Sequence, residues 1–175
     1  MLKHWPNLLA TDCKVVKVND SHLYPIYRNG STSLYMAQSE LLVNEQIAKC
    51  KHIEIIIRDP ASRFVSGINE YSRTHKLEIM QTWQDVKSGL LMDRHFAPQV
   101  IWLLHLYKFY KGTVTLRDFN TLSKYTEIHK AKFPGEKTAI PVISELVDAD
   151  HKLIPLLNKT SELGDIVEEF KDVLS

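Results

Sequence analysis

Two polar segments in this chain have the composition of anion-binding loops, and each follows an apolar stretch. The first consists of Arg28, Asn29, Gly30, Ser31, Thr32 and Ser33. Gly30 lets the backbone bend and approach a ligand closely, and backbone amides at the start of a following helix favour a negatively charged group. We therefore expect this loop to hold a phosphate. Simple N-capping by Ser31 or Thr32 is the structural alternative, and the missing Gly-Lys-Ser/Thr ending excludes a Walker loop.

The second segment begins where an apolar stretch ends, and its sequence is RDPASRFVSGINEY. Arg58 closes the apolar stretch, and Ser66 follows about two helical turns later, with Arg63 between them. A guanidinium and a hydroxyl that converge at one place bind phosphate by charge-assisted hydrogen bonds. Alternatively, Arg58 pairs with Asp59 or Glu70 and Ser66 is incidental.

A third segment, DRHFAPQ at residues 93–99, completes a resemblance that the first two segments begin. Together the three resemble sulfotransferases that use 3′-phosphoadenosine 5′-phosphosulfate (PAPS). In that family a Lys-x-Gly/Ala-Ser/Thr-Thr-Ser loop is followed by Arg-Asp/His-Pro and Arg-x-x-Ser. The third segment is similar to the His-Trp-x-Pro-Gln element of the carbohydrate (Golgi-type) branch. Order and spacing agree with that branch from Leu23 to about Tyr125.

The resemblance implies a role for each matching residue. Arg28, Asn29 and the Gly30–Ser33 segment would hold the 5′-phosphate and the sulfuryl group, and Arg58 and Ser66 would hold the 3′-phosphate. Arg28 stands where the family has a lysine that assists departure of the bridging oxygen. An arginine keeps the positive charge but is a poor proton donor, because its pKa exceeds about 12. Stabilisation of the leaving phosphate survives this change, whereas proton donation does not.

Sulfuryl transfer also needs a base that removes the proton of the acceptor hydroxyl. His95 is the first candidate, because it lies in the element that resembles the carbohydrate branch. Its structural alternative is a histidine that caps the next helix or bonds a backbone carbonyl. Glu40 and Glu45 are rivals on the expected helix after the first loop. The other histidines show no metal-ligand spacing, so no metal site is expected.

These loops need a scaffold that brings them to one place, and the order of the apolar segments indicates one. Residues 13–18, Leu23–Tyr27, Ile53–Ile57 and Val114–Leu116 read as strands, with a turn at Asn19-Asp20. The almost uniformly apolar Ile53–Ile57 is typical of a central strand covered on both faces. We expect one α/β domain over residues 1–175, with a P-loop-like sulfotransferase fold and a central parallel sheet between helices on both faces. Ligands then bind beyond the carboxyl ends of the strands.

Periodic apolar residues and turn signals predict the helices. The expected helical segments are Thr32–Ala48, Ala61–Arg73, part of 74–92 with Trp83 and Val86 inward, Gln99–Tyr110, Ile143–Leu157 and Ser161–Leu174. Asn120–His129 reads as a helix or turn, and 130–141 as a loop. In the last helix, Ile166, Val167, Phe170 and Val173 form an apolar stripe that covers the sheet or a second subunit.

Composition narrows the possible partners. The 175 residues are 44% hydrophobic and 25% charged, with a net charge of +1, which suits a globular domain. The chain lacks the excess of basic residues that would predict nucleic-acid binding. No apolar run approaches a membrane span or a signal peptide, so we expect a cytoplasmic protein. Cys13 and Cys50 read as two buried thiols.

The resulting hypothesis is a sulfotransferase that moves a sulfuryl group from PAPS to a hydroxyl acceptor, most simply a carbohydrate. The arginine at position 28 in place of lysine, and the short chain, keep a second hypothesis open. In this hypothesis the chain is a PAPS-binding module that has lost catalysis. A small-molecule P-loop kinase is a third, which the missing Lys-Ser/Thr pair disfavours. Acceptor specificity is expected in the variable loops Thr74–Arg94 and Lys130–Pro141. The short chain suggests an open cleft, or a site completed by a second subunit in a homo-oligomer.

Overall fold

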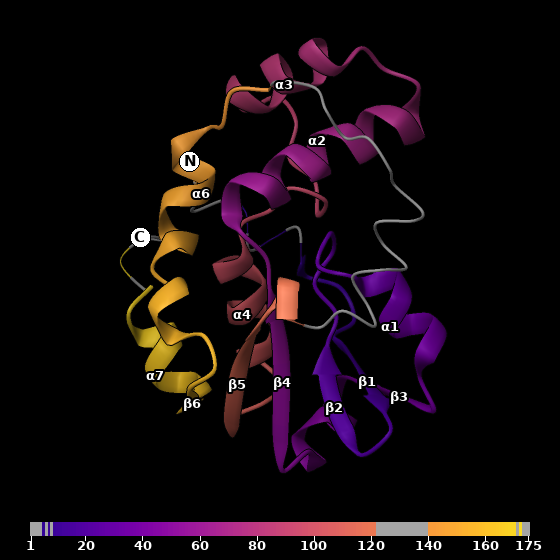
Figure 1. The fold of residues 1–175 in the computed structure, drawn as a ribbon, viewed down its shortest axis with the longest axis vertical. Coiled ribbons are helices and arrows are strands. Elements are labelled where there is room, and N and C mark those ends of the chain that lie inside the picture. The colour runs from indigo at the N-terminus through magenta and orange to yellow at the C-terminus, as the bar shows by residue number, and fades with distance from the viewer. Residues whose placement is uncertain (1–4, 6, 8, 122–139, 171, 173–175) are drawn as a thin grey trace.

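The computed structural model describes residues 5, 7, 9–121, 140–170 and 172. It is an α/β structure with one mixed sheet of six strands in the order β3-β1-β2-β4-β5-β6 (Figure 1). The strands are β1 (Lys14–Val18), β2 (Ser21–Tyr24), β3 (Glu40–Val43), β4 (His52–Ile57), β5 (Thr113–Asp118) and β6 (Thr160–Glu162).

The first two strands form the hairpin that the Asn19-Asp20 turn predicts. Asn19 adopts a positive φ of 55°, and Val18 pairs with Ser21 across the turn. β2 ends at Tyr24, three residues before the predicted boundary at Tyr27. Pro25 explains this early end, because proline has no amide hydrogen to donate to a neighbouring strand.

The predicted helix over Thr32–Ala48 is wrong beyond its first two turns. Helix α1 spans Ser31–Ala37, the chain then forms strand β3, and a 3-10 helix, η2, covers Asn44–Lys49. β3 pairs with the outer edge of β1, where Val16 faces Leu41. Pairing with that open strand edge satisfies backbone groups that a helix would satisfy internally, so tertiary contact outweighs a helix-like pattern.

The predicted central parallel sheet is present in part, because the sheet is mixed. β4 is parallel to both β2 and β5, whereas β1 is antiparallel to both β2 and β3, and β6 is antiparallel to β5. A two-residue turn can join only antiparallel strands, while parallel strands need a long crossover. The parallel part is therefore limited to the three central strands, which are the strands that follow or precede the helical crossovers.

The remaining helices agree with the predicted segments in place but are often shorter. They are α2 (Pro60–His75), α3 (Ile79–Lys87), α4 (Gln99–Tyr107), η3 (Phe119–Thr121), α6 (Ser144–His151), η4 (Ile154–Leu156) and α7 (Leu163–Glu168). The two long C-terminal helices are thus replaced by shorter ones and by β6. Most of the predicted segments Asn120–His129 and 130–141, together with Val173, lie outside the described residues.

Apolar side chains cover both faces of the sheet. Ile53, Ile55 and Ile57 of β4 belong to the main core, together with residues of α4, α6 and α7. The other face has a smaller cluster in which Ile56 lies with Leu34 of α1. The apolar stripe of the C-terminal segment is buried within this chain, where Ile166, Val167 and Phe170 join the main core.

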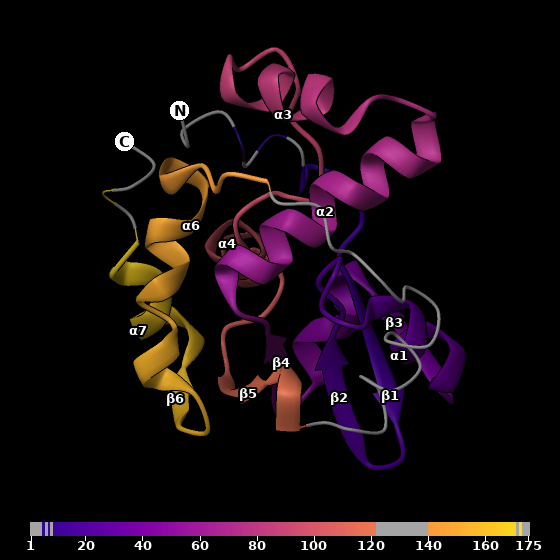
Figure 2. The ribbon, with the colours of Figure 1, turned by 45° about the horizontal axis from the view of Figure 1, so that its top comes forward.

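Helix α2 crosses above the carboxyl ends of β2 and β4 in both ribbon views (Figure 1, Figure 2). Asp59 caps its N-terminus by accepting a hydrogen bond from Ser62 N, and Pro60 occupies the first turn. None of the helices in the described ranges is long and apolar enough to cross a membrane.

Candidate functional site

The two predicted loops lie side by side at one edge of the sheet. Leu23 pairs with Glu54 and Tyr24 with Ile55 in parallel register, so β2 and β4 end at the same edge. The loop that begins at Pro25 and the segment that begins at Arg58 are therefore neighbours. This is the edge at which parallel strands present ligand-binding loops.

Backbone conformation shapes the first loop. Arg28 and Gly30 both have positive φ, at 70° and 83°. Asn29 N donates to Ile26 O, and this hydrogen bond closes a turn from Ile26 to Asn29. Gly30 is the N-cap residue of α1, and no side chain caps that helix. The alternative in which Ser31 or Thr32 serves as a plain N-cap therefore does not describe this loop. Thr32 is exposed and Ser33 is buried.

Arg28, Ser66 and Arg58 are in direct contact. Arg28 Nε donates to Ser66 Oγ at 2.8 Å, and both side chains are buried. Arg58 Nη1 donates to the carbonyl oxygen of Arg28 at 3.0 Å, and its guanidinium lies 4.9 Å from the ring centroid of Phe119. The residues that the resemblance divides between two phosphate subsites thus meet at one point.

The carboxylates proposed as alternative partners of Arg58 are engaged elsewhere. Asp59 Oδ2 accepts from Ser62 N at 2.9 Å, and Glu70 forms an ion pair with Arg73 at 2.6 Å. Burial alone would raise the pKa of Glu70, but the hydrogen bond from Arg73 and the charge of Arg28 bring it below its ordinary value. The Glu70 carboxylate therefore pairs with Arg73 while it lies within electrostatic range of Arg28.

Arg63 is a member of this site that the sequence did not single out. It is 2% exposed, and it donates to Tyr27 O at 3.0 Å and to Ala97 O at 2.5 Å. Its Nη2 is buried without a hydrogen-bond partner among the described residues. Burial lowers the pKa of Arg63 to about 10, Asp150 opposes this effect, and Arg58 and Arg28 add to it. The available signal was its place one turn before Gly67, on the α2 face that meets the loops.

Asn29 points into the protein. Its Nδ2 donates to Ile56 O at 2.8 Å and to Gln99 Oε1 at 2.6 Å, which leaves its buried Oδ1 without a partner among the described residues. Gln99 also accepts from Arg58 N and donates to Arg58 O, each at 3.0 Å. Asn29 thus joins the loop to β4 through Gln99, a residue that lies in the third predicted segment.

Asp150 anchors this network from α6. Its two carboxylate oxygens accept from Gln99 N at 2.7 Å and from Val100 N at 2.9 Å, at the N-terminus of α4. Burial raises the pKa of Asp150, and these hydrogen bonds and the charge of Arg63 oppose the rise. Because Asp150 caps α4, His95 is not the cap of that helix.

His95 lies beside the loops, in contact with an aromatic cluster. Its Nδ1 is 2.5 Å from Asp93 Oδ1, and its ring centroid lies 5.5 Å from that of Tyr27. Burial would raise the pKa of Asp93, but hydrogen bonds from His95 bring it below its ordinary value. A carboxylate that accepts from Nδ1–H leaves Nε2 as the proton acceptor, which is the arrangement that a general base needs.

The rival bases lie elsewhere. Glu40 is on β3, the outermost strand of the sheet, and Glu45 is on η2, which follows β3. Strand β1 separates β3 from β2, so Glu40 is not on a strand beside β4. Cys13 and Cys50 are buried free thiols, as predicted, and burial raises the pKa of Cys13 to about 12. The described residues include no group of three His, Cys, Asp or Glu side chains placed to hold a metal ion.

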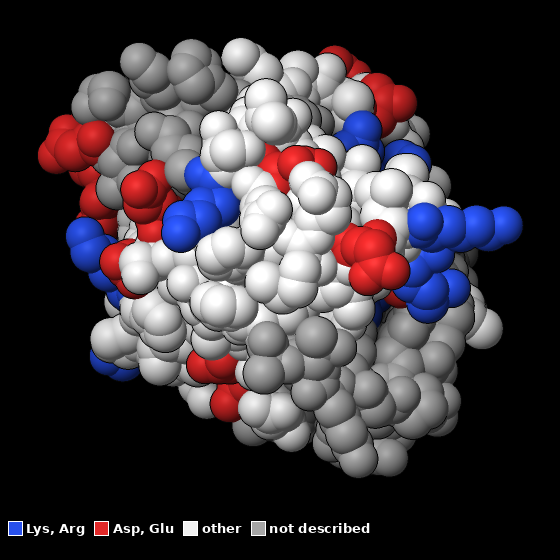
Figure 3. All heavy atoms as spheres, turned by 90° about the horizontal axis from the view of Figure 1, so that it is seen from above, with Lys and Arg blue, Asp and Glu red and all other residues white. Residues whose placement is uncertain are grey.

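The surface above α2 and α3 has no extended patch of one charge sign among the described residues (Figure 3). The cationic character of the site is local, since it depends on Arg28, Arg58 and Arg63. Comparison of the chain with protein-family models, curated proteins and solved structures found no match.

Proposed function

We propose that this chain binds PAPS at the edge where β2 and β4 end, and that it transfers the sulfuryl group to a hydroxyl of a carbohydrate. The observation that supports this most is the convergence of Arg28, Arg58 and Arg63 with Ser66 at that edge. Three guanidinium groups brought together by the fold repel one another, and a bound polyanion relieves that repulsion.

Each residue has a defined task in this proposal. Arg58 and Ser66 would bind the 3′-phosphate by charge-assisted hydrogen bonds. The Gly30–Ser33 segment would bind the 5′-phosphate, with amides and hydroxyl groups as donors. Arg28 would stabilise the negative charge that develops on the departing phosphate. PAPS supplies the activated sulfuryl group.

His95 would act on the acceptor. The acceptor oxygen forms a bond to sulfur while the bond from sulfur to the bridging phosphate oxygen breaks, and that electron pair stays on the phosphate. His95 Nε2 accepts the hydroxyl proton, and Asp93 stabilises the imidazolium that results. The products are the sulfate ester and adenosine 3′,5′-bisphosphate.

Calorimetry with adenosine 3′,5′-bisphosphate tests the binding half of the proposal. Replacing a charged donor costs about 1.5–3 kcal/mol, so Arg58→Ala should weaken binding by roughly 10- to 150-fold. Arg117→Ala is the matched control, because Arg117 lies on β5 and pairs with Glu54 on the sheet face. Absence of binding by the wild type, or equal affinity in Arg58→Ala, refutes the proposal.

A second function, a PAPS-binding module without catalysis, is favoured by the position of Arg28. Its Nε is engaged by Ser66 in a buried contact, which suits a structural tie better than a proton donor. Transfer of labelled sulfate from PAPS to a hydroxyl acceptor by the wild type would exclude this module. In the enzyme, His95→Gln should lower turnover by about 10²- to 10⁴-fold and leave bisphosphate affinity unchanged.

A further inference from the structure

A cavity of about 180 Å³ lies next to the candidate site, between the N-terminal segment, β2, α1 and α4. Five of the described lining residues precede or begin β1, and they are Leu9, Thr11, Asp12, Cys13 and Lys14. Four others form an aromatic group that we call the aromatic wall. Its members are Tyr24, Tyr27, Tyr35 and Trp102.

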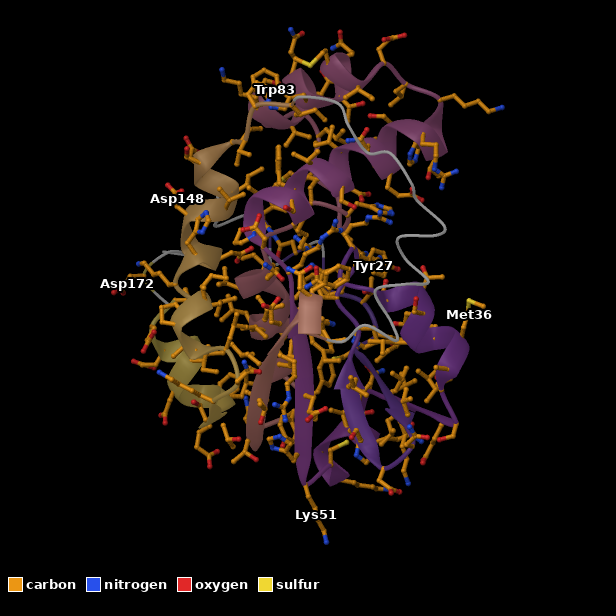
Figure 4. All side chains as sticks on the ribbon, viewed as in Figure 1. Tyr27, Met36, Lys51, Trp83, Asp148 and Asp172 are labelled. Atoms are coloured by element: carbon orange, nitrogen blue, oxygen red, sulfur yellow. The ribbon has the colours of Figure 1, made fainter. Side chains whose placement is uncertain are left out.

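The cavity adjoins the loop at Arg28–Ser33 on two sides. Tyr27 directly precedes Arg28, and Tyr35 lies on α1, whose first residue, Ser31, belongs to the loop. The Tyr27 ring lies between two groups, with its centroid 5.1 Å from that of Trp102 and 5.5 Å from that of His95. Figure 4 shows Tyr27 at the upper end of β2, below α2. Tyr27 lines the cavity whereas His95 does not, so the acceptor hydroxyl must extend past the Tyr27 ring to reach the proposed base.

Two buried nitrogens in the wall lack a hydrogen-bond partner among the described residues. They are Trp102 Nε1 and His105 Nδ1, and the two side chains are 6% and 5% exposed. Both nitrogen atoms have almost no accessible surface, so they lie within the wall and are not reached from the cavity. Burial is the main cause that lowers the pKa of His105 to about 4, so its imidazole is neutral at pH 7 and does not bring a buried positive charge to the cavity.

The size and lining of the cavity indicate which class of ligand it can bind. An engineered cavity of about 150 Å³ takes one benzene molecule, so this volume suits a single six-membered ring. A plain aromatic ring would make no hydrogen bond to the charged groups Asp12, Lys14 and Arg94 of the lining. A sugar ring offers an apolar face to an aromatic side chain and hydroxyl groups to polar ones.

We infer that this cavity is the acceptor subsite and receives one monosaccharide unit. Its role as acceptor subsite depends on the proposed function, whereas sugar binding as such does not. Tyr27 and Trp102 provide apolar contact, Arg94 and Asp12 bind hydroxyl groups at the rim, and the hydroxyl to be sulfated lies toward the loop at Arg28. This position uses Arg94 from the predicted specificity loop Thr74–Arg94, and an N-terminal wall that the sequence did not indicate.

Saturation-transfer NMR tests sugar binding with three probes: methyl α-D-glucopyranoside, methyl α-D-galactopyranoside and methyl N-acetyl-β-D-glucosaminide. Phenol is the comparison ligand. At least one glycoside should bind the wild type with millimolar affinity. Tyr35→Ala and Arg94→Ala should each weaken it by about tenfold or more, since each removes a wall or rim contact. Tyr107→Ala, a half-buried tyrosine at the other end of α4, should not.

Bisphosphate affinity is measured on the same samples and separates the two proposals. If the bisphosphate binds but no glycoside does at about 50 mM, or if phenol alone binds, the inferred subsite is wrong and the proposed function stands. Equal glycoside binding in both pocket variants, each shown to be folded by circular dichroism, also overturns the inference. If a glycoside binds with the expected variant effects while the bisphosphate does not, the proposed function fails and the sugar site stands.

Discussion

Gly67 is the point at which α2 touches the loop that holds His95, and Gly67→Ala tests this contact directly. A Cβ atom built at position 67 would lie 2.3 Å from the carbonyl oxygen of His95 and 2.8 Å from its carbonyl carbon. Both neighbours are backbone atoms, which cannot swing aside as the tip of a side chain can. The loop must therefore withdraw by about 1 Å to restore ordinary van der Waals contact.

Two opposing effects set the size of the change in stability. Alanine favours the helix over glycine by about 1 kcal/mol, whereas overpacking that shifts backbone typically costs about 1–3 kcal/mol. Because the clash is deep and involves backbone, we expect a net loss of about 1–2 kcal/mol in the free energy of unfolding. For a chain of this size that corresponds to a fall in Tm of roughly 2–8 °C.

Thermal unfolding followed by circular dichroism measures this change, and Gly164→Ala is the matched control. Gly164 also lies in a helix, but the nearest atom to its added Cβ is Tyr107 Oη at 3.1 Å, at the end of a side chain that can move. The control should be neutral or stabilising. In the proposed enzyme, Gly67→Ala should also lower turnover by up to about 10²-fold, since a 1 Å displacement of His95 spoils its alignment. A Tm for Gly67→Ala equal to or above that of wild type would refute the described packing.

Two further predictions concern buried titratable groups. Asp150→Ala removes the acceptor for Gln99 N and Val100 N and leaves Arg63 buried without its counter-charge, so it should cost about 3–5 kcal/mol in urea unfolding. The exposed Asp148→Ala should change stability by less than about 0.5 kcal/mol, and equal effects would show that Asp150 has no special role. The pKa of His105 is about 4 in the folded chain, below its ordinary 6.5. Between pH 6.5 and pH 4 the unfolded chain therefore binds more protons than the folded chain. The free energy of unfolding should fall by up to about 3 kcal/mol as the pH drops through this range. His105→Gln should lack this part of the pH dependence, and an unchanged slope of stability against pH would contradict the assignment.

Local signals in the sequence predicted the elements that position the site. The Asn19-Asp20 turn, the apolar strand β4 and the helix predicted over Ala61–Arg73 all appear in the structure. These features depend on backbone conformations and capping bonds within a few residues, so their signals are short-range. The same reasoning failed at β3, because its pairing with β1 depends on a strand edge that lies more than twenty residues away in the chain.

The amino-acid sequence by itself determined that a flexible glycine loop and an arginine-ended strand reach one edge of the sheet. Only the tertiary structure decided which atoms meet there. Arg28 bonds Ser66, Arg63 bonds Tyr27 and Ala97, and Asn29 turns inward to Gln99. These partners are 34 to 70 residues apart. Their contacts depend on how α2 and the loop before α4 pack over the sheet, and no local pattern of residue types specifies that packing.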